Sequence, residues 1–65
     1  MTGEELKAIR EAWGMTQAEF GRALGYTIKS IANFESGRKP IQEHLEKHIL
    51  AEHRLFLLKK VIENT

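Results

Sequence analysis

Two side chains in the middle of the chain, Lys29 and Asn33, have the chemistry and the spacing to contact nucleic-acid bases. In a helix, residues four apart lie about one turn apart on the same face. The asparagine amide can form two hydrogen bonds with adenine, whose N7 accepts and whose N6 donates. The lysine ammonium can donate to O6 and N7 of guanine, or to a phosphate. The segment therefore suggests contact with a DNA major groove, and a plain solvated helix face is the alternative.

The neighbouring positions extend this face. If Thr27 is the N-cap of a helix that Gly37 ends, positions 28, 29, 32, 33 and 36 point outward, while 31, 34 and 35 point inward. Ile28 and Ala32 could pack on thymine methyl groups, although core packing is an equal alternative for Ile28. The candidates for phosphate contacts are Gln17, Thr27, Ser30, Ser36, Arg38 and Lys39. For Arg38 and Lys39 the alternative is an ordinary basic loop.

Capping signals predict the helices that position this face. Thr2 with Glu5, and Thr16 with Glu19, form the Thr-x-x-Glu pattern of a capping box. The first helix should therefore start at residue 3 and stop at residue 14, and a second should run from residue 17 to Gly25, which can close it in the left-handed conformation. Residues 16–37 then form two short helices joined by a tight turn, the arrangement of a helix-turn-helix.

The C-terminal segment, residues 41–63, carries a helical apolar stripe without glycine or proline up to residue 62. One long helix and two helices bent near Ala51 fit the stripe equally well. Trp13 should pack the first helix against this segment. Residues 55–62 hold more apolar side chains than one face of a monomeric helix needs, so we expect contact with a second copy. The candidate dimer contacts are Leu55, Leu58 and Ile62.

Composition bounds the remaining possibilities. The 65 residues suit a single domain, with a net charge of +1 and no cysteine or aspartate. There is consequently no disulfide, Cys nucleophile or Ser-His-Asp set, and no glycine-rich phosphate loop, so we expect no catalytic residue, cofactor or small-molecule substrate. His44, His48, Glu52 and His53 do not match a zinc motif, and we expect no metal. No signal peptide or membrane span is evident, which favours a cytoplasmic protein.

Four ordered motifs carry a resemblance to a known family. They are Leu6-x-x-Ile9-Arg10, Gly14-Met15-Thr16-Gln17-x-Glu19-Phe20-Gly21, Leu24-Gly25-Tyr26-Thr27 and Ile31-x-x-Phe34-Glu35-x-Gly37-x-x-Pro40. Over residues 5 to about 50 the chain resembles the Cro/C1-type (XRE-type) helix-turn-helix family of phage and bacterial DNA-binding regulators. The resemblance implies an all-α, compact four- to five-helix bundle, the lambda-repressor-like DNA-binding domain. It also implies homodimers on palindromic operators and, usually, repression of transcription.

The resemblance assigns roles to further residues. In the family, the position of Gln17 touches bases or braces the recognition helix. Arg10 and Glu35 resemble an ion pair that ties the first helix to the end of the third, and two exposed charges that never meet are the alternative. Gly21 departs from the usual alanine where the two helices approach closely. The segment after Leu50 also departs, because it lacks the short loop that usually precedes a fifth helix.

The sequence therefore predicts a transcriptional regulator that binds double-stranded DNA, most simply a repressor. Two copies should place their recognition helices about 34 Å apart on a palindromic operator. A rival reading is a protein-interaction module, antitoxin-like or a phage accessory protein, which would use its apolar C-terminal helix. A nonspecific architectural DNA binder is a third possibility.

Overall fold

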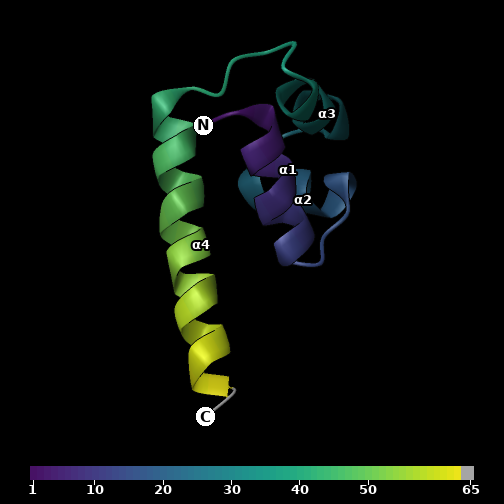
Figure 1. Ribbon diagram of the computed structural model, residues 1–65. Helices are drawn as coiled ribbons and strands as arrows, with labels where there is room; N and C mark the ends of the chain where they lie inside the picture. The colour runs from purple at the N-terminus through teal and green to yellow at the C-terminus, as the bar shows by residue number, and fades with distance from the viewer. Residues whose placement is uncertain (64–65) are drawn as a thin grey trace.

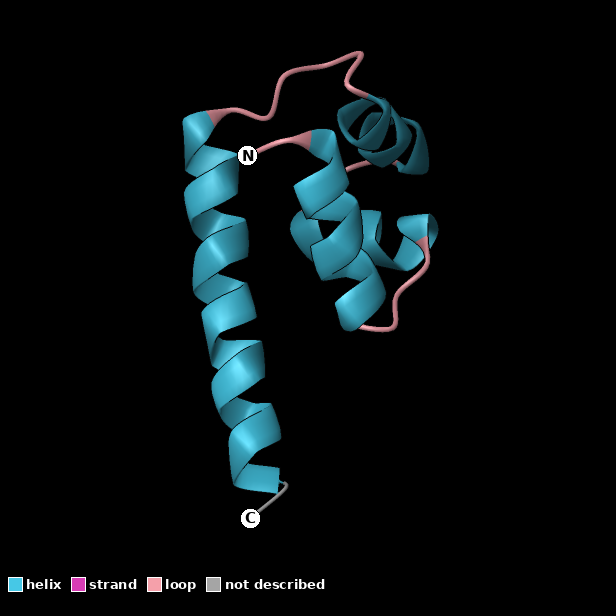
Figure 2. Cartoon of the chain, viewed as in Figure 1, coloured by secondary structure: helices cyan, strands magenta, loops and turns pink. Residues whose placement is uncertain are grey.

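The computed structural model describes residues 1–63, which form four α-helices and no strand. They are α1 (Gly3–Ala12), α2 (Gln17–Leu24), α3 (Ile28–Ser36) and α4 (Glu43–Glu63). The first three are short and cluster together, and α4 runs along one side of the cluster (Figure 1). The connections are short, apart from the longer loop that carries the chain from α3 to α4 (Figure 2). The all-α fold predicted from the sequence is confirmed.

The two predicted capping boxes start α1 and α2. The Thr2 hydroxyl accepts a hydrogen bond from the Glu5 amide at 3.1 Å, and the Glu5 carboxylate accepts one from the Thr2 amide at 2.8 Å. Thr16 and Glu19 repeat the exchange at 3.1 and 2.9 Å. Gly25 ends α2 in the left-handed region, with φ of 82°. Local side-chain chemistry therefore places both ends of α2 where the sequence predicts them.

The hydrophobic core lies where all four helices meet. Its buried side chains are Leu6, Phe20, Ile31, Phe34, Leu45 and Ile49. Leu6 comes from α1, Phe20 from α2, the next two from α3 and the last two from α4. No helix therefore buries its apolar face without the others, and the three short helices depend on this packing because each is too short to be stable alone in water.

The C-terminal segment forms one uninterrupted helix, which decides between the two alternatives that its periodicity leaves open. The first half of α4 contributes Leu45 and Ile49 to the core. The Met1 amino group also forms an ion pair with Glu46 of α4. Further along, Trp13 donates a hydrogen bond from Nε1 to Nδ1 of His53 at 2.9 Å and packs 6.2 Å from the Phe56 ring. Trp13 thus anchors α1 to α4, as the sequence predicts.

The second half of α4 exposes apolar side chains. Its exposed large apolar side chains are Leu55, Leu57, Leu58, Val61 and Ile62, and Leu50 in the first half is exposed as well. The three candidate dimer contacts are therefore accessible on the surface of this chain. Among residues 1–63, no helix combines the length and apolar character that a membrane span requires.

Candidate nucleic-acid interface

Helix α3 separates an inward from an outward side as predicted. Ile31 is fully buried, Phe34 is 6% exposed, and the Glu35 side chain is also 6% exposed. On the other side, Ile28 is 55% exposed, so the alternative in which it packs into the core is wrong. Lys29 and Ser36 are exposed as well, while Ala32 and Asn33 are only half-buried. The predicted base-reading set is therefore accessible, most fully at the first turn.

The N-terminal end of α3 is closed by two hydroxyl side chains. The Thr27 hydroxyl oxygen accepts a hydrogen bond from the Ser30 amide at 3.1 Å and forms a second hydrogen bond with the Ser30 hydroxyl at 3.0 Å. Either hydroxyl can be the donor of this second bond, so one of the two hydroxyl hydrogens stays available for another acceptor. These two predicted phosphate donors therefore act as a pair, with one hydroxyl hydrogen free between them.

At the other end of α3, the Asn33 carbonyl gathers two donors. The Ser36 hydroxyl donates to it at 3.2 Å, and the Lys39 backbone amide donates to it at 3.2 Å. Gly37, with φ of 83°, allows the chain to turn back in this way. Ser36 can donate to a phosphate only by giving up this bond, which weakens its candidacy. Arg38 and Lys39 lie exposed in the loop that follows.

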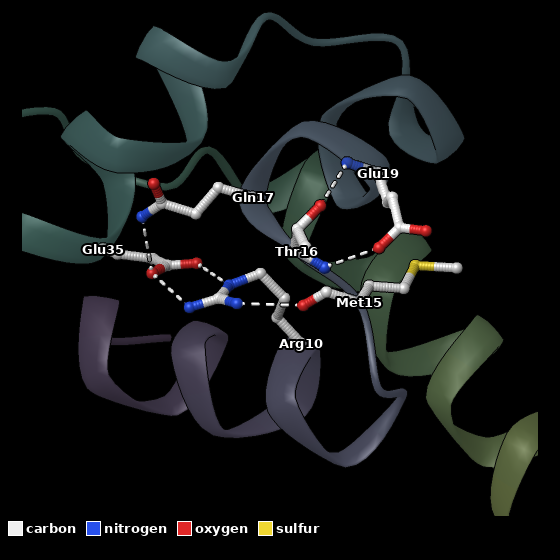
Figure 3. Close-up of polar contacts among 6 residues, drawn as sticks. All are labelled: Arg10, Met15, Thr16, Gln17, Glu19 and Glu35. Atoms are coloured by element: carbon white, nitrogen blue, oxygen red, sulfur yellow. Dashed lines mark hydrogen bonds and ion pairs between the residues drawn. The ribbon is translucent and has the colours of Figure 1, made fainter.

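A polar network behind α3 joins the three short helices (Figure 3). Arg10 of α1 donates from Nε to Oε2 of Glu35 at 2.6 Å and from a terminal nitrogen to Oε1 at 3.2 Å. Its remaining terminal nitrogen donates to the Met15 carbonyl at 2.9 Å. Gln17, the first residue of α2, donates from Nε2 to Oε1 of Glu35 at 3.1 Å. One carboxylate on α3 therefore receives hydrogen bonds from both α1 and α2.

The network is a charged pair largely removed from water, because the Arg10 side chain is 12% exposed and that of Glu35 is 6% exposed. The hydrogen bond to Glu35 raises the pKa of Arg10 above its already high value, against the opposing effect of burial. The bidentate geometry fixes the orientation of α3 as well as its distance from α1. Gln17 takes the bracing role that the family resemblance allows, with its carbonyl oxygen and second N–H still able to contact DNA.

Two glycines, one in α1 and one in α2, allow close approach to the backbone of α3 and of the turn before it. A Cβ at Gly21 would lie 2.5 Å from the Tyr26 carbonyl oxygen, which belongs to the turn between α2 and α3. A Cβ at Gly3 would collide with the carbonyl oxygens of Phe34 and Glu35. Both obstacles are backbone, so they cannot rotate away. The departure from alanine at Gly21 is therefore a geometric requirement of this chain.

Two contacts were not foreseen from the sequence. The Met15 carbonyl accepts a hydrogen bond from Arg10, and His53 accepts one from Trp13. His53 also stacks on Phe56, with ring centroids 6.0 Å apart. The signal in the sequence that could have indicated the His53 contact was the i, i+3 spacing of His53 and Phe56, which places both on one side of α4. Within residues 1–63, no group of three potential metal ligands comes together.

These features define a helix-turn-helix protein: α2 and α3 are joined by a tight turn, α3 is braced from behind, and its outer face is accessible. The family model for the helix-turn-helix domain matches residues 2–47, so the chain belongs to that family. No curated protein and no solved structure matches the chain. Membership in this family indicates a DNA-binding regulator and a DNA partner.

Proposed function

We propose that this protein is a Cro/C1-type transcriptional regulator, a cytoplasmic repressor that binds a specific double-stranded DNA sequence through the major groove. The observation that carries the proposal is the orientation of α3. Its inward residues Ile31, Phe34 and Glu35 are held by the core and by the Arg10 network, which leaves the opposite side open to a ligand.

Base recognition is assigned to the outer face of α3. Lys29 is exposed and can reach guanine acceptors, and Asn33 can pair with an adenine edge. Ile28 is well placed by its 55% exposure to pack on a thymine methyl group, with Ala32 beside it. Gln17 adds a contact from α2 through the polar atoms that Glu35 does not use.

Phosphate contacts would hold this face in register without reading sequence. The donors best prepared for this role are one hydroxyl of the Thr27–Ser30 pair, the side chains of Arg38 and Lys39, and the free backbone N–H groups at the start of α2. Ser36 would first have to give up its internal hydrogen bond to the Asn33 carbonyl. Because these contacts release counterions, affinity should fall steeply with salt.

The proposed active form on DNA is a homodimer. A palindromic operator presents two half-sites, and two copies would place their α3 helices about 34 Å apart in successive major grooves. The exposed Leu55, Leu58 and Ile62 of α4 offer the apolar surface for pairing.

Selection from random duplex DNA, followed by sequencing, tests the proposal. A symmetric consensus is expected, and Lys29→Ala and Asn33→Ala should each weaken binding to it by about tenfold to a hundredfold. Lys60→Ala is the matched control for Lys29→Ala, because it also removes one exposed positive charge but lies in the last turn of α4. The C-terminal end of α4 is remote from α3 (Figure 1). A library that yields no consensus would instead identify a nonspecific architectural binder.

The exposed apolar half of α4 also supports a second candidate, a protein-interaction module of the antitoxin-like or phage accessory kind. Such a module would keep its protein partner when Lys29 and Asn33 are both replaced by alanine, whereas a DNA reader would lose its operator.

A further inference from the structure

One row of residues on α4 has the spacing of a helix-pairing seam. Ala51, Leu55, Leu58 and Ile62 follow one another at intervals of four, three and four residues. Their side chains are exposed, with Leu55 at 58%, Leu58 at 54% and Ile62 at 72%. An average interval of about 3.5 residues keeps a row aligned with the axis of a neighbouring helix, which is the pattern of coiled coils.

The centre of this row lies on a different side of α4 from the buried residues, although Leu55 at its edge also lines the groove between α4 and the Trp13 and Leu24 side chains. Leu45, Ile49 and Phe56 pack toward the core and Trp13. At about 100° of rotation per residue, the mean direction of the exposed row is more than a quarter turn away from theirs. The domain therefore covers only one side of α4, and the row is one of the apolar surfaces that stay exposed, with Leu57 and Val61 on another side.

We propose that the uncovered row pairs with the same row of a second copy, with the two α4 helices antiparallel. Leu55 would lie opposite Leu58 of the second copy, and Ala51 opposite Ile62. The proposal deepens the homodimer of the proposed function, on which it rests, by assigning its helix direction and register. A two-fold axis near residues 56 and 57 would generate every contact twice.

Charge and volume both favour the antiparallel direction. Glu52 and Lys59 flank the same edge of the row, and the antiparallel register brings Glu52 of each copy near Lys59 of the other. A parallel pair would instead bring Arg54 near Lys59 of the second copy, which places like charges together. The antiparallel register also sets the small Ala51 against the large Ile62, whereas a parallel pair would stack alanine on alanine.

The same observations select a second copy over another protein. A row that is complementary to itself under a two-fold rotation needs no other partner, since the acidic position and the basic position of each pair both come from this chain. If a different protein covers the row, the isolated chain will be monomeric, and that result overturns the proposal.

Cysteine cross-linking in free solution tests the register, because the chain has no cysteine of its own. Leu55→Cys protein is mixed with Leu58→Cys protein that carries a mass tag, and the mixture is equilibrated in a glutathione redox buffer. The antiparallel register predicts that the mixed disulfide exceeds both homodisulfides. A parallel pair would give mainly homodisulfides at each position, and no cross-link above that of an exposed Lys7→Cys control would indicate no pairing. Either result overturns the proposal.

Charge reversal tests the direction by sedimentation, without any cross-link. Lys59→Glu should weaken the antiparallel dimer about tenfold, since it replaces two attractive pairs with two repulsive ones. The same change would strengthen a parallel dimer, because Arg54 would then face a glutamate. Glu52→Lys combined with Lys59→Glu should restore the wild-type dissociation constant, and failure of this rescue would count against the Glu52–Lys59 pair.

A pair of neighbouring leucines supplies the matched control. Leu58→Lys should abolish the dimer, whereas Leu57→Lys, at a residue of similar exposure outside the row, should change its dissociation constant less than threefold. Equal effects of the two would overturn the register. None of these measurements contains DNA, so a dimer that forms as proposed while no DNA consensus emerges would refute the proposed function alone.

Discussion

The Arg10–Glu35 pair yields the most direct test of how α3 is held. Arg10→Met removes the bidentate bond to Glu35 and the bond to the Met15 carbonyl while keeping an unbranched apolar side chain. Because the Glu35 side chain is 6% exposed, its carboxylate would remain buried without its counter-charge. Loss of one partner of a buried ion pair costs about 3 to 5 kcal/mol.

We expect the lower end of that range, about 3 kcal/mol. Gln17 still donates to Glu35 in the variant, and the 12% exposure of the arginine site gives water a path to the carboxylate. A chain of this length has a total stability of roughly 3 to 10 kcal/mol, so the loss could leave the variant barely folded. The measurement is urea unfolding followed by the fluorescence of Trp13, which lies between α1 and α4.

A double variant keeps the test decisive if the single variant does not fold. Arg10→Met with Glu35→Leu removes both charges and should recover most of the lost stability, since apolar pairs often replace buried ion pairs at little cost. Lys7→Met, at an exposed position of the same helix, is the control and should change stability by less than about 0.5 kcal/mol. A loss below about 0.5 kcal/mol for Arg10→Met would refute the reasoning that the buried pair holds α3.

Three further predictions follow from other contacts. Gly21→Ala should destabilise by about 1 to 3 kcal/mol in urea unfolding, because the strain against a backbone carbonyl outweighs the gain in helix propensity. The capping-box bonds lower the pKa of Glu19 below its ordinary 4.5, so the stability that Glu19 contributes is present above pH 4.5 and is lost as the pH falls through the lowered pKa. In Glu19→Gln, the urea midpoint of unfolding should therefore change less with pH between about 5 and 3. His53→Phe should cost about 1 kcal/mol by leaving the Trp13 N–H without its acceptor, whereas His48→Phe at an exposed site should cost less than half as much.

The helices were predictable because their ends depend on short-range chemistry. Thr2, Thr16 and Thr27 each accept a bond from an amide three residues later, and Gly25 and Gly37 each take a positive φ that other residues avoid. The continuity of α4 was not predictable in this way. An apolar stripe repeats equally well across a bend, so its spacing does not decide between the two.

The parts of the site that escaped prediction involve donors that have more than one possible acceptor. Gln17 could turn its amide toward DNA or toward Glu35, and Ser36 could donate to a phosphate or to its own helix. Spacing shows that such side chains share a region, but it does not show which acceptor each one takes. The Trp13 indole N–H is the clearest case, since its acceptor His53 lies 40 residues away in the sequence.

The position of Glu35 links the stability of the domain to its proposed recognition of DNA. Helix α3 has nine residues, too few to hold its shape alone, so its orientation depends on what its inner side contacts. The first turn is closed by Thr27, the middle is buried through Ile31, and the last turn is fixed by Glu35 between α1 and α2. Lys29, between the first two of these attachments, therefore presents its ammonium from a helix that cannot rotate about its axis without breaking the Glu35 network. A substitution in that network should thus reduce affinity for DNA even where the domain stays folded. It would let α3 rotate about its axis, and the outer face then no longer points in a fixed direction.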